Sequence, residues 1–116
     1  MRILKFRITY QHGETGRITE RFIELGETFP SLGDGWAIIG KDQFIGMPDK
    51  NGTEIYEGDT VLRYGKHAFD VKWNKNFCGF SPLCEYRNNY GLPDAEESSR
   101  LSEVIGNIYE TPELER

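Results

Sequence analysis

Short stretches of alternating apolar and polar residues, separated by glycine-containing turns, recur along the chain and restrict its fold. In the first, Leu4 to Tyr10, every second residue is apolar. Further strand-like stretches follow near residues 18–25, 53–56, 60–64, 69–73 and 104–109. A period of two is typical of a half-buried strand, whereas an amphipathic helix repeats every three to four residues. The pattern predicts a mainly β, antiparallel fold without a convincing amphipathic helix.

The first part of the chain, residues 1–43, is predicted to form a β-hairpin and a connection. The polar segment "QHGETG" supplies the hairpin turn between the first two strands. Residues 26–35 contain glycines and a proline, which favour an irregular connection. The short apolar run "WAIIG", residues 36–40, then suits a buried strand.

The second part, residues 44–116, is predicted to form an SH3-like barrel, so that residues 1–116 make one small domain. Strand, glycine bend, strand, hairpin and final strand follow one another there at short intervals. Residues 85–100 are polar and lack an apolar period, which favours a mobile or a functional loop. Within them, "PDAEESSR" could instead form one helical turn.

The segment "DKNGTEIYEGDTV", residues 49–61, contains two turn signals. Asn51 and Gly52 tolerate the positive φ angles of a two-residue turn. Gly58 can adopt a left-handed conformation, and the Asp59 carboxylate can accept hydrogen bonds from backbone amides just beyond it. We therefore interpret these four residues as structural turn residues.

The acidic residues of this segment also admit a metal or acid–base interpretation, which we consider weaker. Glu54 and Glu57 are an odd number of positions apart, so a strand would point them to opposite faces. The segment also lacks the later oxygen ligands and the closing glutamate of a calcium loop. The sequence therefore predicts no catalytic residues and no metal site in this segment.

Cysteines and histidines do not form a recognisable site either. Cys78 and Cys84 are the only cysteines, and His12 and His67 occur singly, without the close ligand pairs of zinc modules. No neighbouring cation or helix start is evident that would activate a thiol. We expect structural thiols, no metal, no cofactor and no enzymatic activity.

Charge and hydropathy limit the cellular partners. With 19 acidic and 14 basic residues the formal net charge is −5, which opposes condensation on the phosphates of duplex DNA. No apolar run approaches the roughly 20 residues that cross a membrane, and the first residues become polar too early for a signal peptide. The expected location is the cytoplasm, without membrane contact.

Two motifs resemble the YopX family of small bacteriophage and prophage proteins. The first is "DKNGTEIYEGDTV" at residues 49–61, which follows "FIGMP" at 44–48. The second is "EVIGNIYETPEL" at 103–114, and Phe6-Arg7 is similar to the usual opening of the family. The resemblance implies a β-rich fold and a source in phage or prophage. It implies no assigned activity and no catalytic residues.

The residues thus favour a non-catalytic binding or interaction module that acts on a phage or host protein or by self-assembly. Tyr86, Arg87 and Tyr90 lie in the polar loop, where two aromatic rings and a guanidinium suit a protein interface. Ordinary packing of these tyrosines on the barrel is the alternative.

The alternative function is that of a small β-barrel that binds nucleic acid. Basic residues gather around one hairpin and form a possible basic patch of Arg63, Lys66, His67, Lys72 and Lys75. Exposed aromatic rings would be needed for stacking on bases, but apart from Tyr86 and Tyr90 the candidates, Trp36, Trp73 and Tyr109, should belong to the core.

Strand edges lead to the last expectation, a homo-oligomer. The first strand carries charge on one face only, and residues 104–109 contain no lysine or arginine. Unprotected edges expose unpaired backbone groups and invite pairing with another chain. Covering of an edge by the loop at 85–100 is the competing solution, which would give a monomer.

Overall fold

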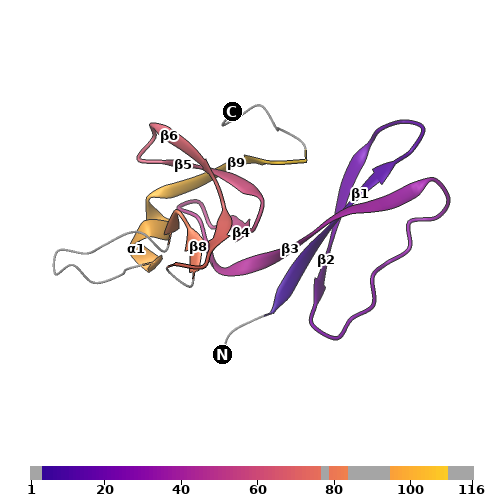
Figure 1. The fold of residues 1–116 in the computed structure, drawn as a ribbon, viewed down its shortest axis with the longest axis horizontal. Helices are drawn as coiled ribbons and strands as arrows, with labels where there is room; N and C mark the ends of the chain where they lie inside the picture. The colour runs from indigo at the N-terminus through magenta and orange to yellow at the C-terminus, as the bar shows by residue number, and fades with distance from the viewer. Residues whose placement is uncertain (1–3, 77–78, 84–94, 110–116) are drawn as a thin grey trace.

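The computed structural model describes residues 4–76, 79–83 and 95–109. This part of the chain is mainly β, its paired strands are all antiparallel, and it contains one short helix (Figure 1). The elements are β1 (Lys5–His12), β2 (Ile18–Glu24), β3 (Trp36–Pro48), β4 (Glu54–Tyr56), β5 (Asp59–Arg63), β6 (His67–Asp70), β7 (Lys72–Asn74), β8 (Gly79–Ser81), α1 (Ala95–Arg100) and β9 (Ser102–Asn107).

The expected N-terminal hairpin is confirmed, and it belongs to a four-stranded sheet in the order β2-β1-β3-β4. The hairpin register runs from Lys5 opposite Glu24 to Gln11 opposite Ile18. Strand β3 has 13 residues; it pairs with β1 as far as Gln43 and with β4 from Phe44 onward. As Figure 1 shows, β3 therefore runs from the N-terminal sheet into the C-terminal half of the molecule.

The prediction of a short buried strand at residues 36–40 is wrong. This run is only the beginning of β3, and Ile38 and Ile39 are each 40% exposed. Gly40 lies opposite Thr9 and Ile38 lies opposite Tyr10, so that Ile39 is the extra residue of a bulge. A bulge interrupts the alternation of faces, which an apolar run by itself does not reveal.

The first strand is not an edge. Strand β1 lies between β2 and β3, because the connection after β2 returns the chain to the other side of β1. The last strand, β9, is an edge of the three-stranded sheet β6-β5-β9. Of the two strands that the sequence analysis proposed as sheet edges, only β9 is an edge strand in the described part of the chain.

The stretch from Phe69 to Trp73 is also not one strand with an apolar face. It divides at Val71 into β6 and β7, and β7 forms a hairpin with β8. Val71 is buried and its backbone is held by the amide of Gly58 and the carbonyl of Asp59. Phe69 and Trp73 are exposed, Trp73 by 54%, so the expectation that Trp73 belongs to the core is wrong.

The buried apolar residues form two clusters, one in each half of the molecule. The N-terminal cluster contains Ile8, Tyr10 and Ile23, with Trp36 packed against it. The C-terminal cluster consists of Ile55, Val61, Val71 and Leu83, with Ile45, Phe80 and Val104 packed against it. Each cluster is small, so contacts between the two halves matter for the stability of the whole chain.

The glycines of both turn signals have positive φ angles, but the predicted two-residue turn is wrong, because Asn51 has no positive φ and residues 49–53 connect β3 to β4. Gly52 has φ +85°, and its amide donates to the carbonyl of Asp49 in the turn from β3 to β4. Gly58 has φ +89° in the bend between β4 and β5. Asp49 reinforces the first turn, because its carboxylate accepts the amides of Asn51, Thr53 and Val104.

The segment "PDAEESSR" includes α1, in agreement with its interpretation as a helical turn. Residues 84–94, which contain most of the predicted loop, lie outside the described residues.

We predict that Gly58→Ala lowers the free energy of unfolding by about 1–2 kcal/mol, since a Cβ atom disfavours the left-handed conformation. Gly13→Ala is the matched control, because Gly13 lacks a positive φ and an added Cβ would meet its nearest atom at 3.7 Å. Urea unfolding measures both changes. Equal midpoints for the two variants would contradict the assigned role of Gly58.

Candidate functional site

The site is built around Arg7, a charged residue in the middle of a central strand. Arg7 lies opposite Asp42 on β3 and opposite Phe22 on β2. Residues directly opposite each other in antiparallel strands share one face of the sheet. This face turns toward the C-terminal half, and Arg7 is only 4% exposed there.

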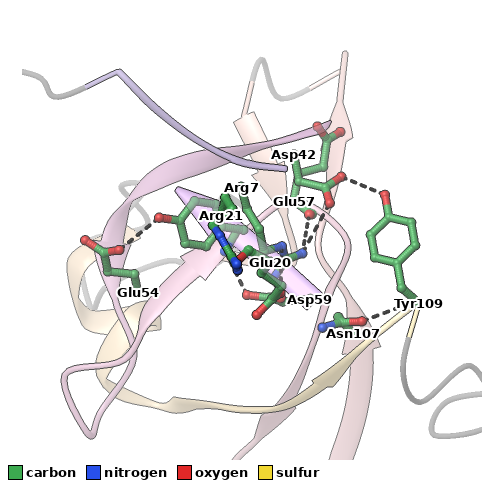
Figure 2. Close-up of polar contacts among 10 residues, drawn as sticks. Arg7, Glu20, Arg21, Asp42, Glu54, Glu57, Asp59, Asn107 and Tyr109 are labelled. Carbon is green, nitrogen blue, oxygen red and sulfur yellow. Dashed lines mark hydrogen bonds and ion pairs between the residues drawn. The ribbon is translucent and has the colours of Figure 1, made fainter. Parts of the chain in front are cut away.

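Arg7 connects the two halves of the molecule through several contacts, most of which Figure 2 shows. Its Nη1 donates to Oδ1 of Asp59 at 2.5 Å, and its Nη2 donates to Oδ2 of Asp42 at 3.3 Å and to the carbonyl of Glu57 at 3.2 Å. The guanidinium also lies over the ring of Tyr56, 5.2 Å from its centroid. One side chain of β1 thus holds both the strand β3 and the bend between β4 and β5.

Asp59 has a different role from the one predicted. Its Oδ2 accepts the amide of Tyr56, which precedes it by three residues, at 2.8 Å, while its Oδ1 binds Arg7. We expected it to accept amides beyond it in the chain. Asp59 therefore stabilises the bend between β4 and β5 and at the same time neutralises the buried guanidinium of Arg7.

Tyr109 completes the cluster from the end of the described chain. Its hydroxyl donates to Oδ1 of Asp42 at 3.2 Å, and its amide donates to Oδ1 of Asn107 at 2.9 Å. A Cβ atom on Gly40 would lie 2.1 Å from the Tyr109 hydroxyl oxygen. Glycine at position 40 therefore leaves the space that the tyrosine ring occupies.

Next to Arg7 a groove of about 440 Å³ lies between the two halves of the molecule. Glu20 and Phe22 of β2 line one wall, and residues 104–107 of β9 line another. Arg7, Glu54, Tyr56 and Asp59 also line the groove. Both β2 and β9 are the outer strands of their sheets. Arg7 and Phe22 share one sheet face, so this face of the N-terminal sheet forms one side of the groove.

Glu54 and Glu20 bring carboxylates to this groove from different strands. Glu54 accepts hydrogen bonds from Lys5 at 2.7 Å and from the Tyr56 hydroxyl at 2.9 Å. Glu20 Oε2 lies 3.5 Å from Nε of Arg7. Phe22 is 54% exposed and its ring centroid lies 5.5 Å from that of Tyr56. The groove thus combines acidic groups with aromatic surface.

Burial dominates the ionisation of the groups around Arg7. It raises the pKa of Asp59 and of Asp42, because one guanidinium does not offset the desolvation of two neighbouring carboxylates. Burial and the carboxylate of Asp42 raise the pKa of Tyr109 to about 12. Glu54 behaves in the opposite way: its hydrogen bond from Lys5 lowers its pKa.

The predicted basic patch is smaller in the structure than in the sequence. Arg63 is buried; its Nη1 donates to the carbonyl of Pro82 and its Nη2 to the hydroxyl of Ser98. Lys66, Lys72 and Lys75 are exposed, as is His67. Arg63 therefore stabilises the C-terminal half and adds no charge to the surface.

Other predicted site residues lie elsewhere or outside the described part. Asn51 is exposed, and its side-chain amide donates to Glu103 at 3.3 Å. Tyr86, Arg87 and Tyr90 lie outside the described residues, as do Cys78 and Cys84. Among the residues that the structure describes, no group of three or more histidine, cysteine, aspartate or glutamate side chains could hold a metal ion.

The sequence motifs include Arg7 only as part of the family-like opening Phe6-Arg7, and they do not indicate Asp42, Glu20 or Phe22 as site residues. The available signal was an arginine in the middle of a strong period-two strand, flanked by Phe6 and Ile8. Finding its partners required the register of β1 with β3, and that register depends on the bulge at Ile39.

Comparison with known proteins assigns the chain to a family. A family model described as YopX protein matches residues 7–115. The chain belongs to the YopX family. The resemblance of the two sequence motifs is thereby confirmed, and the matched range contains both halves of the molecule and the Arg7 cluster. A search of curated proteins finds no match. In the described part of this YopX protein, no helix is long and apolar enough to cross a membrane.

We predict that Arg7→Met lowers the free energy of unfolding by about 3–5 kcal/mol, because it leaves Asp42 and Asp59 buried without their cation. The double variant Arg7→Met, Asp59→Asn should lose less than the sum of the single losses, by roughly 1–3 kcal/mol. Urea unfolding of the four proteins gives this coupling. Additive losses would show that the two side chains do not act as a pair.

We also predict an unusual dependence of stability on pH. A carboxyl whose pKa is higher in the folded state binds its proton more tightly there. Its contribution to stability is therefore complete below the unfolded pKa of about 4 and is lost as the pH rises through the folded pKa. Asp42 and Asp59 should thus lower stability as the pH rises above about 4.

The variant Asp42→Asn should flatten this decline, while Glu54→Gln should steepen it slightly. Glu54 has a lowered pKa, so its contribution is present above its unfolded pKa and is lost as the pH falls. The urea midpoint measured from about pH 4 to pH 8 tests both effects. Parallel curves for the native protein and Asp42→Asn would refute the assignment.

Proposed function

We propose that this YopX protein is a non-catalytic binding module for a phage or host protein in the bacterial cytoplasm. The observation that supports it most is the groove between β2 and β9. An exposed aromatic ring and the border of a sheet are features that protein interfaces use. A groove of about 440 Å³ has the size of a ligand site, and its position between the face of the N-terminal sheet and β9 suits a peptide segment.

The chemistry of the groove favours binding over catalysis. The most deeply buried carboxylate, Asp59, is held by Arg7 and by the Tyr56 amide, so its oxygens have fixed partners. Glu54 is likewise held by Lys5 and Tyr56. General acid–base catalysis needs a group that exchanges a proton with a substrate, and these side chains are engaged in holding the fold.

The alternative function, binding of nucleic acid, has one observation in its favour. Trp73 is exposed between Lys72 and Lys75, and its ring packs edge-on against Phe80 with centroids 5.2 Å apart. A tryptophan next to lysines could stack on a base of a single strand. The net charge of −5 and the burial of Arg63 weigh against it.

We also propose that the strands after residue 44 form an SH3-like barrel. Support comes from the order of the elements: β4 and β5 follow one another across the tight bend at Gly58, and β9 returns to pair with β5. Such a small barrel would present the edge of β9 to a partner. Self-assembly through the same edge is one form that this binding could take.

Affinity capture from the natural host should test the proposed function. Phe22→Ala and Ile105→Ala remove exposed apolar side chains from opposite walls of the groove, and each should reduce capture of the specific partner at least about fivefold, as expected for interface anchors. Phe69→Ala is the matched control, since Phe69 is also an exposed apolar side chain, with an exposed fraction between those of Ile105 and Phe22, but lies on β6.

All three variants must retain the native urea midpoint, so that lost capture reflects lost contact. Unchanged capture by both groove variants would refute the groove as the binding site. Light scattering of the same proteins reports self-assembly: a dimer that Ile105→Ala weakens would identify a second copy as the partner. Salt-sensitive capture of single-stranded nucleic acid that Trp73→Ala abolishes would support the alternative instead.

A further inference from the structure

The groove has an excess of negative charge at its floor and walls. Among the described residues that line it, one cation, Arg7, faces the carboxylates of Glu20, Glu54 and Asp59. Arg7 is already matched by Asp59 at 2.5 Å and by Asp42 at 3.3 Å. Its charge is therefore used within the fold, and Glu20, 3.5 Å from its Nε, is the third carboxylate around a single guanidinium.

Lys5 moderates this excess but does not cancel it. It forms an ion pair with Glu54 at 2.7 Å and lies outside the groove lining. Arg21 is a further neighbouring cation, because its Nη1 donates to the Glu20 carbonyl at 2.7 Å. When Lys5, Arg21 and Asp42 are added to the four lining groups, the described residues supply three cations and four carboxylates. A ligand that brings a positive charge would be attracted, and an anionic ligand would be repelled.

Phe22 supplies the apolar part of the same surface. Its ring is exposed, lies against Tyr56, and shares a sheet face with Arg7. A long side chain with an apolar stem and a cationic end, as in lysine or arginine, matches an aromatic wall beside carboxylates. The guanidinium of Arg7 already lies over the ring of Tyr56, so the protein itself contains such a contact between a cation and an aromatic ring.

Strand β9 provides a backbone edge along the opposite wall. Its beginning is occupied from that side, because Lys50 donates to the carbonyl of Ser102 and Val104 donates to the Asp49 carboxylate. Of the two β9 residues that follow, both of which line the groove, Gly106 lies opposite Thr60 of β5 and Ile105 is the extra residue of a bulge. In the described part of the chain, no strand other than β5 pairs with β9. An extended peptide could lie beside these residues.

From these features we infer that the groove binds an extended segment of a partner protein that places a lysine or arginine side chain between Glu20 and Glu54, against Phe22. This inference rests on the proposed function and specifies the chemistry of the partner. The acidic wall selects the basic side chain, and the edge of β9 favours an extended backbone.

Selection from a library of random twelve-residue peptides tests this chemistry directly. Selected sequences should be enriched in lysine and arginine at least about threefold over the input library, and the strongest peptide should bind more weakly as salt is raised. The variant Glu20→Gln, Glu54→Gln should weaken that peptide about five- to tenfold, in line with the loss of two partly exposed ion pairs.

The control variant is Glu14→Gln, Asp34→Asn, which removes two exposed carboxylates that do not line the groove. It changes the net charge equally and should alter the affinity less than about twofold, because screening weakens distant charges. Equal weakening by both variants would overturn the inference, since it would reveal only a general attraction to an acidic protein.

Two further outcomes distinguish the inference from the proposed function. Selected peptides without basic enrichment whose binding Phe22→Ala still reduces would overturn the inference and leave the groove as a binding site. A library that yields no groove-dependent peptide, combined with host capture that the groove variants do not change, would overturn both.

Discussion

The ion pair between Arg7 and Asp59 is the interaction on which the arrangement of this protein depends. Each half of the chain has only a small apolar cluster. Between the halves, the buried Arg7 and Asp42 lie next to two phenylalanine rings that contact Tyr56. Burying a guanidinium is unfavourable unless its charge and donors are matched. Asp59, Asp42 and the Glu57 carbonyl supply that match only when β1, β3 and the bend at Gly58 are all in place.

This dependence links the groove to the fold. The same Arg7 that joins the two halves lies at the groove floor, and the exposed Phe22 is its neighbour across the hairpin. The "DKNGTEIYEGDTV" segment is thus scaffold in its buried part, where Asp49 and Asp59 accept backbone amides. At Glu54 it also contributes to the surface of the groove. Some residues of this segment therefore only stabilise the fold, whereas others also line the groove.

The apolar alternation and the turn glycines in the sequence predicted those elements that depend only on neighbouring residues. The alternation from Leu4 to Tyr10 gave the first hairpin, and Gly52 and Gly58 have the positive φ angles that their turns require.

Features that depend on contacts distant in the chain were not predictable in the same way. The central place of β1 results from its pairing with β3, and the exposure of Trp73 results from the break at Val71, which is tied to Gly58 and Asp59. Arg63 appears from the sequence to be a surface cation, but Pro82 and Ser98 bind it in the interior.

The central claim, that Arg7 joins two clusters into one cooperative unit, can be tested with the two tryptophans. Trp36 packs against the N-terminal cluster, and Trp73 contacts Phe80 beside the C-terminal one, so Trp73→Phe and Trp36→Phe give a fluorescent probe for each half. Coincident transitions are the mark of two-state unfolding. We expect the two probes to give the same urea midpoint with Arg7 present and different midpoints after Arg7→Met. Separate midpoints with Arg7 present, or coincident and unshifted midpoints without it, would contradict the account.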